Sequence, residues 1–498
     1  MSDTTYEAFL ARVREIGQLA SIESLLDWDS ETYMPPNGLG VRAEQLALLA
    51  SLGHQRRSDP RLGELLDQLE GRVSDPVQLT NVREVRRLHD RAVKIPEDLV
   101  RRISRASTLA KAAWAKARAE SNFPAFAPHL RELLELKRQV ADCLGHGGDR
   151  YDALLDEYEP GADSAQVAAL FAALREPLSR FVRQLQAAPR QPDPSILRRR
   201  FPREAQERFA RRLAAAIGFD FQSGRLDVSN HPFCSGTGSG DVRFTTRYRE
   251  DFFNAAIFGV LHEAGHGLYE QGLDPQHAFT PMGQAVSLGI HESQSRLWEN
   301  FVGRGRPFWD HFYGECQREF PEALGGVPLD SFHAAVNHVA PSMIRVEADE
   351  VTYNLHIVLR FELERALLAG QVAIEDVPSA WNQKMNELLG VTPRNDAEGC
   401  LQDIHWAMGI FGYFPTYALG NLYAAQFFEA ANAAIPDLSD RLRRGDFQTL
   451  REWLRSNIHI HGQRYRPDEL VARISGRPLS IEPFLRYLSD KFAPIYGL

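Results

Sequence analysis

The sequence predicts a mostly α-helical fold with one small β element. Apolar residues recur at three- and four-residue spacing through most of the chain, which is typical of helices that bury one face. Only residues 221–250 alternate over short runs, as half-buried strands do. Of the 498 residues, 44% are hydrophobic and 25% are charged, which are ordinary values for a globular protein with a large core.

The predicted helices follow one another between stretches rich in proline and glycine. Six of them span residues 4–26, 41–53, 96–121, 126–144, 164–187 and 203–217. A longer helix is predicted over residues 340–370 from the same apolar spacing.

The β element is predicted as a hairpin. Leu226, Val228, Val242 and Phe244 alternate on either side of a turn at 235–240. An edge strand beside a metal can hold an extended peptide by main-chain hydrogen bonds. Bracing of the neighbouring helices is an equal alternative.

The most informative motif is H-E-x-x-H at 262–266, inside a predicted helix over 251–271. Positions four apart share a helix face, so the imidazoles of His262 and His266 can reach one Zn²⁺. Glu263 is then placed to act as general base toward a water in the open coordination position. Two core histidines are the alternative, but an accidental match in such a chain has odds of roughly a few per cent.

A catalytic zinc site needs a third protein ligand. Glu270 follows the motif on the same ridge, and a straight helix cannot fold three residues of one ridge around one ion. A second helix is predicted over 284–303, where Glu292 falls 26 residues after the motif and is the favoured ligand. Glu299 is its competitor, or else a solvated charge. His291 is expected as an outer or substrate-facing group.

Five motifs resemble those of the thermostable (Taq-type) metallocarboxypeptidase family, and the likeness covers nearly the whole chain. They are D-x-R-x-T at 241–245, H-E-x-x-H at 262–266, H-E-S-Q at 291–294, I-R-x-x-A-D at 344–349 and G-x-x-Q-D-x-H-W at 399–406. The resemblance implies a helical metallopeptidase: one catalytic domain over residues 1–498, with two helical halves around a deep substrate groove and the β element beside the zinc helix. It also implies a homodimer.

The resemblance implies a zinc-dependent carboxypeptidase of broad specificity that acts poorly on a carboxy-terminal proline. Its substrates are peptides, and its metal ligands are His262, His266 and Glu292. Zn²⁺ is expected, and the ligand set also suits Co²⁺.

An enzyme that removes a terminal residue needs a cation for the free α-carboxylate, and arginine binds carboxylates bidentately. Arg345 is the first candidate, with Arg464 and Arg243 in reserve. Arg345 and Asp349 are four apart and would otherwise pair with each other on a helix surface. Asp349 is alternatively an acceptor for a metal-bound imidazole. Asp241 and Arg243 would otherwise pair with helical neighbours.

Peptide hydrolysis develops negative charge on the former carbonyl oxygen, and a positioned donor stabilises it. His405 and Tyr417 are the candidates, with Tyr417 preferred over Tyr413. Packing in an aromatic core is the alternative role for these side chains.

The net charge of −9 argues against a nucleic-acid binder. The longest apolar stretch is too short to span a membrane, and residues 1–20 lack a signal core. The cysteines are scattered without a C-x-x-C pair, which favours free thiols and a cytoplasmic protein.

Two alternatives share these features. A zinc endopeptidase or dipeptidase of similar helical fold would carry the same motif and downstream glutamate. A non-catalytic helical binding protein could retain a decayed site.

Overall fold

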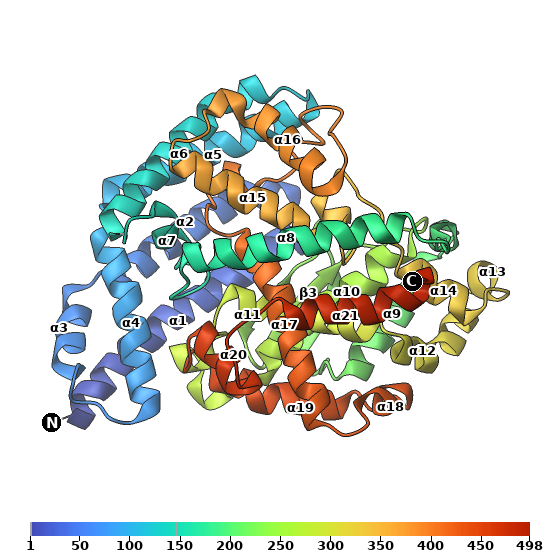
Figure 1. The fold of residues 1–498 in the computed structure, drawn as a ribbon. Coiled ribbons are helices and arrows are strands. Elements are labelled where there is room, and N and C mark those ends of the chain that lie inside the picture. Colours follow the sequence, from blue (N-terminus) through green and yellow to red (C-terminus); the bar gives the residue numbers. More distant parts are fainter. Residues whose placement is uncertain (1, 146) are drawn as a thin grey trace. The chain divides into compact units, whose positions relative to one another are not determined.

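The computed structural model describes residues 2–145 and 147–498, and it is mostly helical with one three-stranded sheet (Figure 1). The chain forms two compact units. The first unit contains the described residues up to Val93, with Asp193–Val336 and Tyr423–Leu479. The second unit contains Lys94–Pro192, Asn337–Leu422 and Ser480–Leu498.

The first unit holds the sheet and most of the helices. Its helices are α1 (Ser2–Thr32), α2 (Leu39–Arg57), α3 (Pro60–Leu69), α4 (Pro76–Lys94, whose last residue belongs to the second unit), α9 (Arg203–Ile217), α10 (Phe253–Gly272), α11 (Leu288–Arg296), the π-helix η5 (Leu297–Gly303), α12 (Arg306–Glu319), α13 (Pro321–Leu324), α14 (Leu329–Val336), α18 (Leu438–Arg443), α19 (Gln448–Asn457) and α20 (Pro467–Ser475).

All regular elements described in the second unit are helices. They are α5 (Glu97–Ala119), α6 (Phe123–Leu144), α7 (Arg150–Leu155), α8 (Ser164–Gln186), α15 (Tyr353–Leu368), α16 (Val377–Leu389) and α21 (Glu482–Tyr496). The boundary between the units falls inside one further helix, α17 (Pro415–Ala434).

The six helices predicted from apolar spacing are all present as α1, α2, α5, α6, α8 and α9. Local signals set their ends. At the start of α8, Asp163 accepts hydrogen bonds from the backbone N–H groups of Ala165 and Gln166, which have no partner inside the helix. At the end of α9, Gly218 takes a φ of 110°, which glycine adopts without a Cβ clash.

The prediction of one long helix over 340–370 is wrong. The helix in this region, α15, begins only at Tyr353, and a 3₁₀ turn occupies Arg345–Glu347. Asp349 accepts the backbone N–H groups of Val351 and Thr352, so this backbone is held in a loop. Apolar spacing could not reveal that competing set of hydrogen bonds.

The sheet has the strand order β1-β3-β2, with β1 at Gly224–Val228, β2 at Cys234–Gly238 and β3 at Asp241–Thr246. The predicted hairpin is β2 and β3, which pair antiparallel. The prediction that the segment with Leu226 and Val228 forms the first strand of the hairpin is wrong. This segment is β1, and it pairs parallel with β3, with Leu226 opposite Phe244. A parallel pair needs a connection longer than a turn, so tertiary packing rather than local sequence sets it.

Helix α10 lies at the centre of the first unit and packs against β2, β3, α9 and α11 (Figure 1). Its apolar residues Phe253, Ile257, Val260 and Leu261 are fully buried. This packing on several sides fixes the face of α10 that carries the H-E-x-x-H motif.

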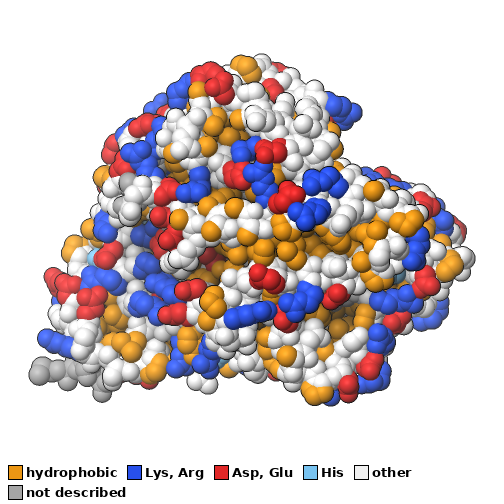
Figure 2. Space-filling view, viewed as in Figure 1, with side chains coloured by type: hydrophobic (Ala, Val, Ile, Leu, Met, Phe, Trp, Pro, Cys, Tyr) orange, Lys and Arg blue, Asp and Glu red, His pale blue; other side chains and the backbone are white. Residues whose placement is uncertain are grey.

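The surface mixes both signs of charge. Figure 2 shows basic and acidic side chains interspersed over the face that it presents. Among the described residues, no helix is both long and apolar enough to cross a membrane. Cys143, Cys234, Cys316 and Cys400 are free thiols.

Candidate metal centre

The three predicted ligands meet between α10 and α11. The Oε2 atom of Glu292 lies 3.6 Å from Nε2 of His262 and 3.3 Å from Nε2 of His266. One ligand atom from each residue lies within 4.8 Å of the others. Ligands bound at about 2.0–2.1 Å to a tetrahedral ion are roughly 3.4 Å apart. The residues therefore fit one small dication.

A glycine in the motif makes this approach possible. A Cβ atom at Gly265 would lie 2.7 Å from the carbonyl oxygen of Gln294 and 2.7 Å from Cα of Ser295. Both atoms belong to the α11 backbone, which cannot move aside as a flexible side chain would. Gly265 thus allows Glu292 to reach the two imidazoles.

Glu292 is held so that one oxygen faces the histidines. Its Oε1 accepts a hydrogen bond from Nε of Arg296 at 2.7 Å, and its Oε2 accepts one from Oγ of Ser295 at 2.9 Å. Burial alone would raise the pKa of Glu292, but the positive charge of Arg296, together with His262 and His266, outweighs burial and holds the pKa well below its usual range. The ligand is therefore ionised.

His262 has a largely buried carboxylate behind it. Its Nδ1 lies 2.9 Å from Oε2 of Glu299, which also accepts a hydrogen bond from Arg296 at 3.1 Å. The expectation that Glu299 is solvated is wrong, because its side chain is 12% exposed. Burial would raise the pKa of Glu299, but three neighbours lower it to about 2: Arg296, His262 and Arg304.

Glu299 reaches this position from the π-helix η5, a form that is often found at functional sites. In sequence, its spacing of seven from Glu292 and three from Arg296 was the available signal.

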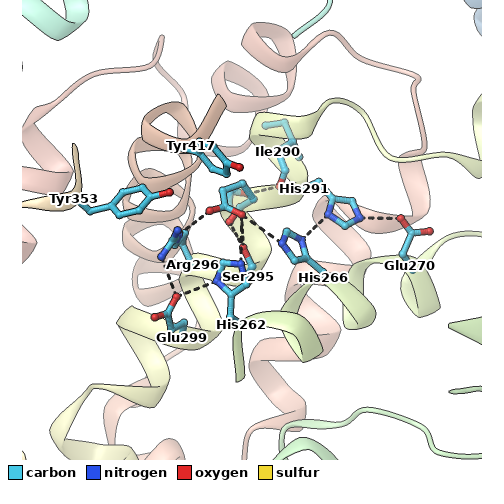
Figure 3. A network of polar contacts seen from close by, with 12 residues as sticks. His262, His266, Glu270, Ile290, His291, Ser295, Arg296, Glu299, Tyr353 and Tyr417 are labelled. Atoms are coloured by element: carbon cyan, nitrogen blue, oxygen red, sulfur yellow. Dashed lines mark hydrogen bonds and ion pairs between the residues drawn. The ribbon is translucent and has the colours of Figure 1, made fainter. Parts of the chain in front are cut away.

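His266 has a different neighbour. Its Nδ1 lies 2.5 Å from Nδ1 of His291, whose Nε2 lies 2.8 Å from Oε1 of Glu270 (Figure 3). His291 therefore contacts the ligand His266 and is not itself one of the three ligands, as predicted. Glu270 lies on the outer side of His291, a role that sequence reasoning missed.

Glu263 is a buried carboxyl group, 7% exposed. Burial raises its pKa to about 7, with the negative charges of Glu292 and Glu299 adding to the effect against the charge of His262. A carboxyl group that titrates near neutrality is suited to take up and release a proton at working pH.

Two of the candidate arginines belong to the first unit. Arg243 forms a bidentate ion pair with Asp241, in which Nε donates to Oδ1 at 2.8 Å and Nη2 donates to Oδ2 at 2.7 Å. The guanidinium of Arg243 also lies 4.4 Å from the ring centroid of Trp28. The alternative in which Asp241 and Arg243 form ion pairs with helical neighbours is therefore wrong. Arg464 lies over the ring of Tyr465, and none of the acidic side chains that the structure describes forms an ion pair with it.

Arg345 belongs to the second unit and is buried. Its Nε and Nη2 donate to Oδ1 of Asp403 at 3.1 and 2.8 Å, and its Nη1 donates to the hydroxyl of Tyr353 at 2.9 Å. The alternative of a surface pair with Asp349 is wrong. A substrate carboxylate at Arg345 would share the guanidinium with Asp403.

Asp349 does not act as an imidazole acceptor. Besides its two loop contacts, it accepts hydrogen bonds from the hydroxyl of Thr352 and the N–H of Ala340. The two ligand imidazoles have acceptors of their own, Glu299 and His291.

The predicted oxyanion donors lie together in the second unit. Nε2 of His405 is 3.3 Å from the hydroxyl of Tyr417, and the guanidinium of Arg345 lies 5.0 Å from the Tyr417 ring centroid. Their roles in catalysis stay predictions.

The profile of the Carboxypeptidase Taq (M32) metallopeptidase family matches residues 8–492. The chain belongs to this family. Among its relatives by sequence, thermostable carboxypeptidase 1 of Thermus thermophilus is 49% identical over 508 residues, 99% of this chain and 99% of that protein. Carboxypeptidase 1 of Bacillus subtilis is 40% identical over 497 residues, 99% of each chain.

A solved structure agrees with this assignment. The M32 carboxypeptidase from Deinococcus radiodurans R1 matches with a TM-score of 0.97 and 41% identity, covering 99% of this chain and 100% of that chain. The protein is therefore an M32 metallocarboxypeptidase, a peptide hydrolase whose family implies a metal ion. Membership in this family disfavours the endopeptidase, dipeptidase and non-catalytic alternatives.

Proposed function

We propose that the enzyme is zinc-dependent, removes the carboxy-terminal residue from peptides with broad specificity, and acts poorly on a terminal proline. The metal assignment depends on two imidazole nitrogens and one carboxylate oxygen facing a common point. Imidazole ligands suit Zn²⁺ and Co²⁺ better than Mg²⁺ or Ca²⁺. The specificity follows from the resemblance to the family.

In this proposal His262, His266 and Glu292 hold the metal. A bound dication of this kind polarises the scissile carbonyl and lowers the pKa of a water molecule toward about 7. Glu263 accepts a proton from the attacking water and returns one to the leaving amine nitrogen.

The substitution Glu263→Gln tests this assignment. The amide keeps the shape of the side chain but cannot accept the proton, so kcat should fall by at least roughly 10²–10⁴-fold. Elemental analysis should still find one zinc per chain, because the side chain at this position is not a ligand in this proposal. The matched control is Glu64→Gln on α3, an exposed glutamate. Activity retained by the Glu263→Gln enzyme would overturn the assignment.

A second experiment identifies the cation for the terminal carboxylate. Peptides with a free carboxy terminus should be cleaved and their amides should not, since only the former carry the charge. Among Arg345→Met, Arg243→Met and Arg464→Met, the variant at the recognising position should raise KM for the free peptide by about tenfold or more. The exposed Arg61→Met on α3 is the control. Equal cleavage of free and amidated peptides would contradict a carboxypeptidase.

A donor for the oxyanion is tested by Tyr417→Phe and His405→Gln. Loss of such a donor should lower kcat by about 10²–10³-fold while KM changes little. A change in KM alone would assign these side chains to substrate binding instead.

We also propose a cytoplasmic homodimer. Helices α1 and α2, with the turn between them, carry six exposed large apolar side chains: Ile22, Leu25, Tyr33, Leu39, Val41 and Leu48. Apolar groups of this number on neighbouring helices are suited to pairing between subunits. One chain has a mass of 56.2 kDa, and light scattering of the wild-type protein should give twice this mass. The double variant Leu39→Lys with Leu48→Lys should give the mass of a single chain. The four free thiols support a reducing compartment.

A further inference from the structure

A continuous chain of hydrogen-bonding groups leads outward from His266. It runs from Nδ1 of His266 to Nδ1 of His291 at 2.5 Å, and from Nε2 of His291 to Oε1 of Glu270 at 2.8 Å (Figure 3). His266 and Glu270 lie one turn apart on α10, and His291 reaches in from α11. The three side chains thus link the two helices that carry the ligands.

The protons on this chain follow from the ligand role of His266. Its Nε2 faces Glu292 and the other ligand imidazole. A neutral imidazole that binds a metal through Nε2 carries its proton on Nδ1. That N–H donates to His291, whose Nδ1 must then be bare. The remaining proton of His291 lies on Nε2 and donates to Glu270. Only this set of tautomers satisfies both hydrogen bonds with neutral rings.

The packing around His291 allows little freedom. Its ring meets that of His266 edge to edge, with centroids 4.5 Å apart and planes 26° apart, and its centroid lies 5.3 Å from that of Tyr269. The carboxylate of Glu270 occupies the space left by Gly236 of β2, where a Cβ atom would lie 2.7 Å from Oε2. The strand therefore closes the outer end of the chain.

The two ligand imidazoles are supported in different ways. His262 bonds directly to Glu299, a carboxylate that Arg296 and Arg304 neutralise. His266 bonds to a neutral ring, and the carboxylate lies one step farther out. In the part of the chain that the structure describes, no lysine or arginine forms an ion pair with Glu270. The Glu270 carboxylate therefore interacts with His291 without a competing cationic partner among these described residues.

We propose that His291 and Glu270 form a positioning dyad that sets the tautomer and orientation of His266 for metal binding. This inference depends on the proposed metal site. Groups behind metal-bound histidines typically contribute about 10–100-fold to metal affinity. Neither residue is a ligand in this proposal; both act through His266.

The test is the dissociation constant for Zn²⁺, measured by competition with a chelating dye on the full-length protein. His291→Phe should raise it by roughly 10–100-fold, and Glu270→Ala by about tenfold. Glu270→Gln should stay within about threefold of wild type, because its amide oxygen still accepts the His291 N–H. The double variant His291→Phe with Glu270→Ala should bind Zn²⁺ no more weakly than His291→Phe alone, since Glu270 acts through His291.

Co²⁺ absorption provides a second readout that a purely structural role would not change. The d–d bands should shift in His291→Phe and Glu270→Ala and return to the wild-type form in Glu270→Gln. Glu64→Ala and Glu64→Gln on α3 are the matched controls. Zinc affinities of His291→Phe and Glu270→Ala within twofold of wild type would overturn the dyad. A wild-type protein that binds no zinc would instead overturn the proposed function.

Should His291→Phe fail to fold, Glu270→Ala decides the question, because Glu270 lies at the outer end of the chain and is partly exposed. Circular dichroism of each metal-free variant identifies such a failure.

Discussion

Glu364 is a carboxyl group buried inside the second unit. It is fully buried, and it accepts hydrogen bonds from the hydroxyl of Tyr151 at 2.8 Å, Nε1 of Trp406 at 2.9 Å and the N–H of Gly412 at 3.1 Å. Burial outweighs these donors and raises the pKa of Glu364 to about 7. The group therefore titrates near neutral pH.

Glu364 should make the protein less stable as the pH rises. In the unfolded chain a glutamate loses its proton near pH 4.3. Because the folded pKa is raised, the contribution of the protonated group is fully present below that pH and is lost as the pH rises through about 7. The loss is on the order of 3 kcal/mol.

The substitution Glu364→Gln removes this titration. Urea denaturation at pH 5 and pH 8 should show the variant gaining stability relative to wild type as the pH rises. The exposed Glu135→Gln on α6 is the control. Parallel pH profiles for the Glu364→Gln and wild-type proteins would contradict a raised pKa of Glu364.

At the scale of elements, the contact between α10 and α11 decides the metal centre. Gly265→Ala should push the α11 backbone away, because the new Cβ would lie 2.7 Å from two backbone atoms. We expect a loss of stability of about 1–3 kcal/mol and zinc binding weakened by about tenfold, since a ligand set tolerates displacements of only about 0.5 Å.

The control for this substitution is Gly40→Ala in α2, where a Cβ atom would meet nothing within 4 Å. That variant should be unchanged or slightly more stable, because alanine favours helix. Thermal denaturation and dye competition measure both variants. Wild-type zinc affinity in Gly265→Ala would show that the helices can separate without moving Glu292.

Elements were predictable where local signals agree. The ends of α8 and α9 follow from Asp163 and Gly218, which act on neighbouring backbone groups. The same apolar spacing failed over 340–352, where Asp349 binds the loop backbone. It also failed for β1, whose parallel pairing with β3 joins segments separated along the chain.

At the scale of the whole molecule, metal binding should stabilise the fold. The ligands come from two helices, and Glu292 follows His266 by 26 residues, so the unfolded chain has no formed site. Zinc at a hundred times its dissociation constant should add about 2.7 kcal/mol, which raises the melting temperature by a few °C.

Calorimetry with zinc and with a chelator measures this shift. The double variant His262→Ala with His266→Ala should show no difference between the two conditions. A shift in that variant as large as in wild type would place the stabilising metal elsewhere.

By itself, the sequence determined the helical class, the H-E-x-x-H helix, Glu292 as third ligand candidate and the family, since each depends on residue type and spacing along the chain. Only the tertiary structure decided what surrounds the ligands: Glu299 behind His262, the His291–Glu270 chain behind His266, and Asp403 on Arg345. These partners are brought together by packing between elements, which residue type alone does not reveal: Glu364 is fully buried, whereas Glu64 and Glu135 are exposed.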